Sequence, residues 1–173
     1  MELNEAIYTR RSYRKYKPDA VPKELLAEIA QAGTYAASGM GRQAGKIVVV
    51  TNKELRDQLM RMNREIMGQT EGDPFYGAPA VIVVLADKNV GTHVYDGALV
   101  MGNMMLEAHA LGLGCCWIHR AKEEFESEEG KEILKKLGIE GEYEGIAHLI
   151  VGYPDGNTPA ARERKADFVT FAE

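Results

Sequence analysis

A run of basic residues near the start of the chain is the stretch whose side chains most clearly suggest a chemical role. In residues 10–17, Arg-Arg-Ser-Tyr-Arg-Lys-Tyr-Lys, five of eight residues are cationic, although the whole chain has a net charge of -5. Arginine guanidinium groups beside a serine hydroxyl suit the oxygens of a phosphate. In an extended backbone Arg10, Ser12 and Arg14 would lie on one side and Arg11 on the other. This pattern favours a local anion site, with a solvated basic face as the alternative.

A second basic cluster lies near the other end of the chain, where Arg162, Arg164 and Lys165 precede the apolar residues 168–171, Phe-Val-Thr-Phe. Basic clusters near both ends, without an evident acid-base pair, are typical of a binding site rather than of a catalytic one. The apolar residues that follow favour an extended β conformation. We therefore expect this tail to add to a sheet edge, either of its own chain or of a partner.

The sequence lacks the motifs of common hydrolases and phosphoryl-transfer enzymes. It has no G-x-x-x-x-G-K-[ST] loop, no H-E-x-x-H motif and no G-x-S-x-G motif. The four histidines, at positions 93, 109, 119 and 148, show no metal-ligand spacing, and His148 is interpreted as a core residue of a strand. The adjacent Cys115 and Cys116 are interpreted as inert strand residues. Any redox chemistry must then come from a bound cofactor.

The length and charge of the chain limit the classes of protein to which it can belong. A chain of 173 residues is most simply a single domain over residues 1–173. The negative net charge argues against a general nucleic-acid binder, which needs a basic face. No uninterrupted apolar run approaches 18 residues, and the first five residues, Met-Glu-Leu-Asn-Glu, do not resemble a signal peptide, so we expect a cytoplasmic protein without membrane contact.

A helix predicted over residues 96–111 organises the rest of the chain. Its apolar residues fall on nearly every side of the helical wheel, and Asp96 is the predicted N-cap. So short a chain cannot easily cover such a helix, and we therefore expect a homodimer. Gly112 and Gly114 end the helix, and a strand over residues 115–118 leads to His119 and Arg120 at its C-terminal end.

The remaining elements are predicted from periodicity and from turn residues. Helices are expected over residues 2–9, 23–32, 52–67 and 123–137, with Gly33 ending the second and Asn52 capping the third. Strands are expected over residues 46–50, 80–86 and 146–153. The continuous apolar run of residues 80–86 predicts a strand that is covered on both faces. Glycines at 39, 41 and 45 would let a backbone approach a flat ligand closely.

Taken in order and spacing, several segments resemble the FMN-dependent nitroreductase family, and within it the short single-domain members of clostridial type. The segments are residues 10–14, 37–43, 73–80, 103–106, 114–118, 152–154 and 162–165. The resemblance implies an α+β, nitroreductase-like three-layer fold, in which helices flank a mixed central β-sheet. It also implies a dimer with an exchanged C-terminal extension and two FMN molecules at the subunit interface.

The resemblance assigns site residues by position. It implies that Arg10, Ser12, Arg162 and Arg164 hold the phosphate, with Arg11 and Arg14 nearer the ribityl and pyrimidine end. The ring would be contacted by Ser38 and Gly39, expected from the other subunit, and by Asn63. The segment from Trp117 to Arg120, with Ile118 and His119 among its site residues, would pass over the flavin and offer a backbone N–H to its N5 atom. The roles of Arg42 and Gln43 stay open, because many relatives have Asn where Gly41 stands.

The same resemblance implies a reaction. The protein would accept hydride from NADH or NADPH and pass two electrons to nitroaromatics, quinones or similar small electron acceptors in a ping-pong cycle. No catalytic side chain and no metal are expected, because the chemistry would take place on FMN. The alternatives are a non-redox FMN-binding or flavin-fragmenting protein of the same fold, and a plain anion-binding module.

Overall fold

The computed structural model describes residues 1–173, and its centre is a four-stranded sheet. The strands are β1 (Gly45–Val50), β2 (Ala80–Asp87), β3 (Gly114–Ile118) and β4 (Tyr143–Gly152), in the order β1-β2-β4-β3. These four strands pair antiparallel. A parallel bridge between Ser12 and Cys115 at the outer edge of β3 adds the parallel pairing of the predicted mixed sheet.

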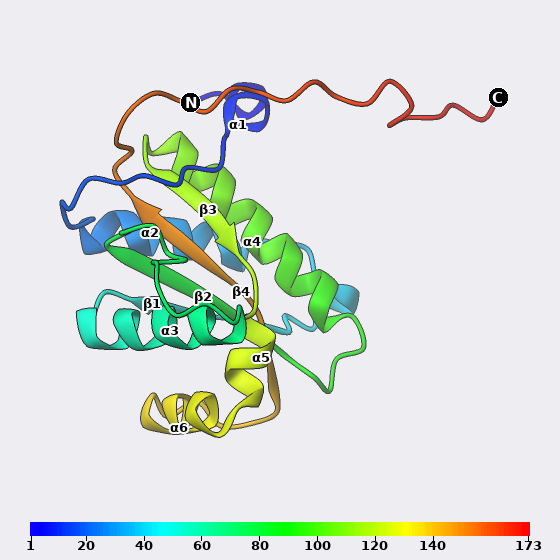
Figure 1. Ribbon diagram of the computed structural model, residues 1–173. Helices are drawn as coiled ribbons and strands as arrows, with labels where there is room; N and C mark the ends of the chain where they lie inside the picture. The colour runs from blue at the N-terminus through cyan, green and yellow to red at the C-terminus, as the bar shows by residue number, and fades with distance from the viewer.

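Helices cover both faces of the sheet and give the predicted three-layer α+β fold (Figure 1). On one face α2 (Lys23–Thr34) packs against α4 (His93–Ala110), and the short α1 (Leu3–Thr9) contacts α4. On the other face lie α3 (Lys53–Ile66), α5 (Ala121–Glu126) and α6 (Glu128–Lys136). Each face therefore has its own hydrophobic core, and the sheet separates the two.

Strand β2 shows directly why the sheet lies between two helical layers. Its residues from Ala80 to Ala86 are all buried, as their continuous apolar run predicts. Side chains alternate along the strand, so that Ile82 and Val84 enter the core beneath α2 and α4, while Val83 and Leu85 enter the core beneath α3 and α6.

Several helix boundaries differ from the sequence-based prediction. Helix α4 begins at His93 after Thr92, so Asp96 is a buried residue of the first turn rather than the N-cap. The single helix predicted over residues 123–137 is two helices, because Ser127 adopts an extended conformation and its Oγ accepts from the N–H of Gly130 at 3.0 Å. Serine favours such a cap, and it starts a new helix here.

The residue type of Gly33 suggested that it ends α2, but it does not. The helix continues to Thr34, and a Cβ atom at position 33 would lie 2.8 Å from Cγ of Met104. This glycine instead permits the close approach of α2 to α4. The predicted cap of α3 is confirmed, since Oδ1 of Asn52 accepts from the N–H of Leu55 at 2.8 Å.

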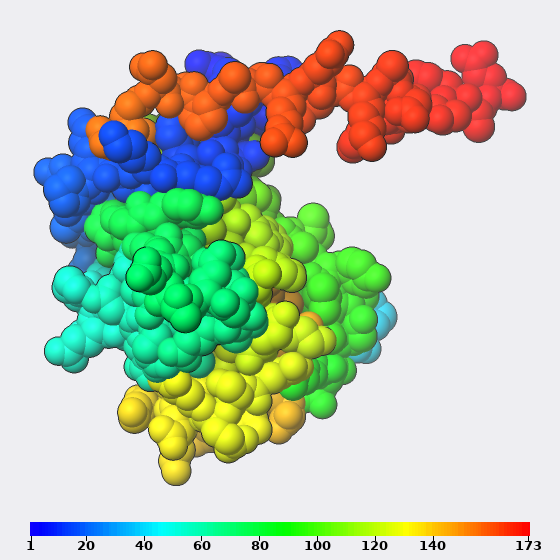
Figure 2. All heavy atoms as spheres, viewed as in Figure 1, coloured from blue at the N-terminus to red at the C-terminus, as the bar shows by residue number.

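The chain after residue 155 leaves the body of the molecule, and we call residues 156–173 the C-terminal arm. Figure 2 shows this arm projecting past the N-terminal residues. The strand expected at residues 168–171 is absent, and Phe168 and Phe171 are 79% and 84% exposed. Within one chain α4 is not covered on every side, because Tyr95 and Leu99 are exposed. No helix combines the length and the apolarity that spanning a membrane requires.

Candidate functional site

The basic segment, residues 10–17, lies along the outer edge of β3. The N–H of Tyr13 donates to the carbonyl of Cys115 at 3.0 Å, and the N–H of Lys17 donates to the carbonyl of Tyr153 at 2.9 Å. Tyr13 and Tyr16 are buried, and the Tyr16 hydroxyl donates to the carbonyl of Tyr13 at 2.8 Å. Burial raises the pKa of the Tyr16 phenol well above its ordinary value. The two tyrosines therefore anchor the segment that carries the arginines.

Arg10 and Arg11 both have a buried nitrogen that lacks a hydrogen-bond partner, Nη1 in Arg10 and Nε in Arg11. Arg11 uses its Nη1 to donate to the carbonyls of Tyr8 and Arg10, each at 2.8 Å. Unpaired buried donors are costly, and those of a cation more so. An anion bound beside α1 would satisfy both groups. This arrangement fits the predicted phosphate site.

His109, in the last turn of α4, belongs to the same cationic cluster. Its Nε2 lies 2.7 Å from Oγ1 of Thr9. Burial lowers the pKa of His109, and the charges of Arg10 and Arg11 lower it further. Sequence reasoning did not predict this neighbour, because 98 or more positions separate it from the arginines along the chain. The cluster is therefore formed by tertiary packing of α1 against α4.

Cys115, the nearer of the two cysteines to Arg10, lacks the environment of a reactive thiol. Both are free and buried in β3. Burial raises the pKa of the Cys115 thiol to about 12, although the Arg10 guanidinium acts in the opposite direction. A thiol that keeps its proton at neutral pH is a poor nucleophile. The interpretation of the pair as inert strand residues agrees with this environment.

Five of the predicted residues line a single pocket of about 450 Å³, which we call the α3–β3 pocket. They come from the basic segment, from α3 and from the end of β3: Arg14, Asn63, Trp117, Ile118 and His119. The opposite wall is the loop that includes Asp73 and Tyr76, and the Arg14 guanidinium lies 6.0 Å from the Tyr76 ring centroid. A cation, aromatic side chains and a strand end therefore meet in one hollow.

The backbone at the mouth of the α3–β3 pocket is unusual. Arg120 and Tyr76 have φ angles of 79° and 53°, in the left-handed region that non-glycine residues seldom adopt. The N–H groups of His119 and Arg120 donate to no other group of the chain. Sequence reasoning gave Tyr76 no role in the site. It placed Arg120 at the ligand-facing end of the strand, but neither residue type signals a positive φ angle. Strained backbone of this kind is often found at binding sites.

Arg56 of α3 fixes the loop that forms the opposite wall. Its Nη2 lies 2.7 Å from Oδ2 of Asp73, and its Nε donates to the carbonyl of Ala78 at 3.2 Å. Asp73 in turn accepts from the N–H groups of Phe75 and Gly77 at 2.7 and 2.8 Å. This network was not predicted, since it joins two segments that carry no common motif. It holds the Tyr76 backbone in its left-handed conformation.

Asn63 is fully buried in the pocket wall, and its amide group forms hydrogen bonds within the protein. Its Nδ2 donates to the carbonyl of His119 at 2.8 Å and to Oε1 of Glu124 at 2.6 Å. Both donors of the amide are therefore used. Its Oδ1 has no partner. A direct contact of Asn63 with a flavin remains a prediction.

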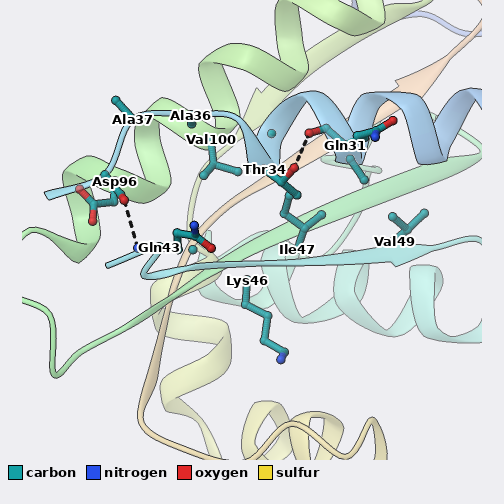
Figure 3. A pocket seen from close by; sticks show the side chains of 14 residues that line it. Gln31, Thr34, Ala36, Ala37, Gln43, Lys46, Ile47, Val49, Asp96 and Val100 are labelled. Atoms are coloured by element: carbon teal, nitrogen blue, oxygen red, sulfur yellow. Dashed lines mark hydrogen bonds between the residues drawn. The ribbon is translucent and has the colours of Figure 1, made fainter. Parts of the chain in front are cut away.

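Ser38 lies at a different place, in the lining of a second pocket of about 440 Å³ between α2, β1 and α4, and Gly39 follows it in the chain. Figure 3 shows Gln31 and Thr34 of α2, Ile47 of β1 and Val100 of α4 around this α2–α4 pocket. The two pockets share no lining residue. One chain therefore does not bring Ser38 and Gly39 to the α3–β3 pocket.

Arg162 and Arg164 are also separated from the other predicted residues. Both belong to the exposed C-terminal arm and form no ion pair. The side chain of Thr158 tethers the base of the arm, since its Oγ1 accepts from the Tyr13 hydroxyl at 3.0 Å. The predicted site is thus divided in one chain: the N-terminal arginines and the α3–β3 pocket lie on the body, and the other residues lie elsewhere.

Comparison with known proteins decides the family. The model of the nitroreductase family matches residues 7–153, which cover the basic segment, both pockets and every strand. The chain belongs to the nitroreductase family. The structural neighbours agree: a nitroreductase with bound FMN from Bacteroides fragilis is 27% identical, with a TM-score of 0.90 and full coverage of both chains. A nitroreductase with bound FMN from Desulfitobacterium hafniense is 28% identical, with a TM-score of 0.89 and the same coverage.

A relative found by sequence comparison carries a name of the same family. A protein of Methanothermobacter thermautotrophicus, inferred by its name to be an NADH dehydrogenase or NAD(P)H nitroreductase, is 33% identical over 121 residues. The match covers 68% of this chain but only 60% of that relative. As a nitroreductase-family protein, the chain has the predicted fold, and the three-layer architecture described above is that of its FMN-bound neighbours.

Proposed function

We propose that this protein is an FMN-dependent NAD(P)H oxidoreductase that reduces nitroaromatics, quinones or similar small acceptors by a ping-pong, two-electron mechanism. The observation that carries the proposal is the pairing of a cationic cluster with unsatisfied buried donors and an adjacent pocket with free backbone N–H groups. Both features belong to one continuous structure, because the basic segment runs from Arg10 into the pocket at Arg14. Membership of the nitroreductase family and FMN-bound neighbours support it.

The residues of the cationic cluster fit a phosphate group. Nη1 of Arg10 and Nε of Arg11 are buried donors without partners, and Ser12 follows them on the same extended segment. A phosphate would accept from these donors and offset the positive charge that already lowers the pKa of His109. Arg162 and Arg164 would join this site only if the C-terminal arm, or that of a partner, folds back on it.

The α3–β3 pocket fits a flat, electron-accepting ring. When bound, FMN would accept hydride from the nicotinamide and deliver two electrons to the acceptor. Arg14 would stabilise negative charge at the pyrimidine end of the ring, because a fixed cation in a pocket needs no reorganisation. The free N–H groups of His119 and Arg120 would donate to a ring nitrogen from the strand end. The other ring face stays open for the reductant and the acceptor in turn.

We further propose a homodimer in which each site is completed by the partner. One chain leaves large apolar side chains exposed on α1, α4 and the C-terminal arm, among them Tyr8 at 70%, Tyr95 at 74% and Phe171 at 84%. Contiguous exposed apolar surface commonly marks a protein interface. A partner that covers α4 would also explain why Ser38, in the α2–α4 pocket, and Gly39 beside it are separated from the α3–β3 pocket of their own chain.

The absorption spectrum of the purified protein is the first test. We expect bound FMN with the yellow absorption bands of an oxidised flavin. Anaerobic mixing with NADH or NADPH should bleach these bands, and a nitroaromatic or quinone should restore them. Retention of FMN without bleaching would favour a non-redox FMN-binding or flavin-fragmenting protein. Absence of flavin, even after incubation with FMN, would contradict the proposal and leave an anion-binding module.

A further inference from the structure

A row of three buried polar residues lies directly behind the α3–β3 pocket. Asn63, Glu124 and His148 are each 0% exposed, and they come from α3, α5 and β4. Nδ2 of Asn63 lies 2.6 Å from Oε1 of Glu124, and Oε2 of Glu124 lies 2.9 Å from Nε2 of His148. Polar groups buried this deeply are costly unless they are satisfied. The three residues take no part in the anion site or in the exposed surface.

His148, the last of these three residues, is held by the sheet and by two aromatic rings. His148 is the cross-strand partner of Ile118 at the end of β3. Its ring lies 5.3 Å from the Phe75 ring centroid and 6.2 Å from the Phe125 ring centroid. Its Nε2 is close to Glu124, but the pair lacks the direction of a linear hydrogen bond, and Nδ1 has no partner. His148 therefore closes the cluster and screens Glu124 from water.

Asn63, the first of these three residues, contacts the backbone of the pocket. Nδ2 of Asn63 donates to the carbonyl of His119 at 2.8 Å, and this carbonyl therefore points inward, toward α3. A peptide unit is planar and trans, so the N–H of Arg120 in the same unit points the opposite way. That N–H donates to no group of the chain. The backbone of Arg120 is left-handed, with φ 79° and ψ 9°, which is consistent with this orientation of the peptide.

Glu124 is what directs the Asn63 amide. An amide NH₂ has two donors, and a carboxylate that accepts one of them leaves the other aimed at the His119 carbonyl. Without Glu124 the buried amide could rotate or turn its oxygen toward His119, which would repel that carbonyl. The peptide between His119 and Arg120 would then lose the hydrogen bond that directs its N–H outward. The left-handed conformation of Arg120 costs energy, and it persists only while neighbours enforce it.

We propose that Asn63, Glu124 and His148 are positioning residues that hold the His119–Arg120 peptide with its N–H directed into the α3–β3 pocket, where it donates to an electron-rich ring atom of the ligand. None of the three needs to contact that ligand. This inference rests on the proposed function for the identity of the ligand, FMN. The orientation of the peptide itself belongs to the protein without any ligand.

The test uses the full-length protein with Asn63→Leu, Glu124→Leu and Glu124→Gln. The two leucine variants remove the donor to His119 or its director, whereas glutamine keeps an oxygen that can accept from Asn63. Glu144→Gln is the matched control, because Glu144 also lies beside a histidine, with its Oε2 3.5 Å from Nε2 of His93, but lines neither pocket. Should the leucine variants fail to fold, Asn63→Ser shortens the side chain, so that its hydroxyl cannot reach both Glu124 and the His119 carbonyl, with a smaller change of volume.

The first readout needs no ligand. The NMR coupling between the N–H and Hα of Arg120, together with the intraresidue N–H to Hα NOE that is strong at positive φ, reports its φ angle in the protein without FMN. We expect the left-handed value in the wild-type, Glu124→Gln and Glu144→Gln proteins, and its loss in Asn63→Leu and Glu124→Leu. A left-handed Arg120 in folded Asn63→Leu or Asn63→Ser protein would overturn the inference. This result would be readable even if the protein bound no FMN.

The second readout uses FMN labelled with ¹⁵N at N5. In the wild-type protein and in Glu124→Gln, we expect the N5 resonance at the position of a hydrogen-bonded nitrogen. In Asn63→Leu and Glu124→Leu it should move toward the position of an unbonded nitrogen, and kcat should fall at least about tenfold with little change in KM. An unchanged N5 resonance in both leucine variants would also overturn the inference. Normal N5 shifts without NAD(P)H turnover in the wild-type protein would contradict only the proposed function.

Discussion

The backbone N–H of Gly39 donates to Oδ1 of Asp96 at 3.0 Å, joining two residues that lie 57 positions apart. The other carboxylate oxygen of Asp96 accepts from Oγ1 of Thr92 at 3.1 Å. Asp96 therefore fastens the glycine-containing loop to the first turn of α4. This contact accounts for the error in the predicted cap, since a buried aspartate that binds a distant backbone looks, in sequence, like a residue that caps its own helix.

We expect Gly39→Ala to destabilise the protein by about 1–3 kcal/mol, as overpacking typically does. A Cβ atom at this position would lie 2.3 Å from Oγ1 of Thr92, so either the loop or Thr92 must move. Urea denaturation would measure the change in the free energy of unfolding. Gly91→Ala is the control, because a Cβ there would meet no atom within 4 Å. Equal stability of the two variants would show that the loop gives way without cost.

Local patterns predicted the parts of the fold that local forces decide. The uninterrupted apolar run of β2 required cover on both faces, and Asn52 offered the side-chain oxygen that a helix start needs. Ser127 shows the limit, because a serine inside a charged amphipathic pattern can either continue a helix or cap the next one. The choice is made by packing, since Phe125 and Ile133 both enter the core beneath the sheet.

The candidate site could be predicted only as a set of segments. The family resemblance gave Arg14, Asn63 and His119 as site residues, and the fold brings them to one pocket. Neither composition nor spacing could show that Asn63 is buried behind the pocket, or that His109 lies among the arginines. Those contacts join residues far apart in the chain. They depend on the relative placement of helices and strands, which no local pattern encodes.

Replacement of Arg10 should weaken FMN binding more than replacement of an arginine on the surface. Arg10→Ala removes a buried donor without a partner, so we expect at least about a tenfold loss of FMN affinity, the effect of one charge-assisted hydrogen bond. Fluorescence titration with FMN would measure it. Arg61→Ala is the control, because Arg61 pairs with Glu65 and Glu129 on the outside of α3. Similar affinities in the two variants would place the phosphate elsewhere.

The lowered pKa of His109 predicts a loss of stability in acid. Its folded-state pKa lies below the ordinary 6.5, so the unfolded chain binds the proton more readily. His109 therefore does not lower the free energy of unfolding well above pH 6.5, and it lowers that free energy as the pH falls through this value. In His109→Gln this component should disappear, which denaturant unfolding at pH 7.5 and pH 5.5 would reveal. A wild-type difference no larger than that of the variant would contradict the prediction.

Anion binding should act on the same histidine in the opposite direction. Burial is the largest cause of the low pKa of His109, and the charges of Arg10 and Arg11 add to it. A phosphate held by the two arginines would offset their charge, so the pKa of His109 should rise when FMN or inorganic phosphate binds. An NMR titration of the imidazole protons, with and without ligand, measures this change. Arg10→Ala should raise the pKa of His109 before any ligand is added.

Removal of the C-terminal arm should separate the proposed dimer and weaken FMN binding. In one chain the arm carries Phe168 and Phe171 into solvent. Its side chains form no ion pair with the body, and its tether is the hydrogen bond from the Tyr13 hydroxyl to Oγ1 of Thr158. A stable protein interface buries about 1,200–2,000 Å² in total, and an extended arm laid across a partner contributes much of that area. A chain that ends at residue 156 should therefore show a smaller mass by light scattering at micromolar concentration.

Point variants separate the two roles of the arm. Phe168→Ala with Phe171→Ala should weaken the dimer while leaving the arginines in place, whereas Arg162→Ala with Arg164→Ala should preserve the dimer and lower FMN affinity. The two effects differ because apolar burial drives association and guanidinium groups bind phosphate. Light scattering and FMN titration on both double variants distinguish them. A truncated chain that remains dimeric and binds FMN normally would show that the arm serves neither role, and that α4 and α1 alone form the interface.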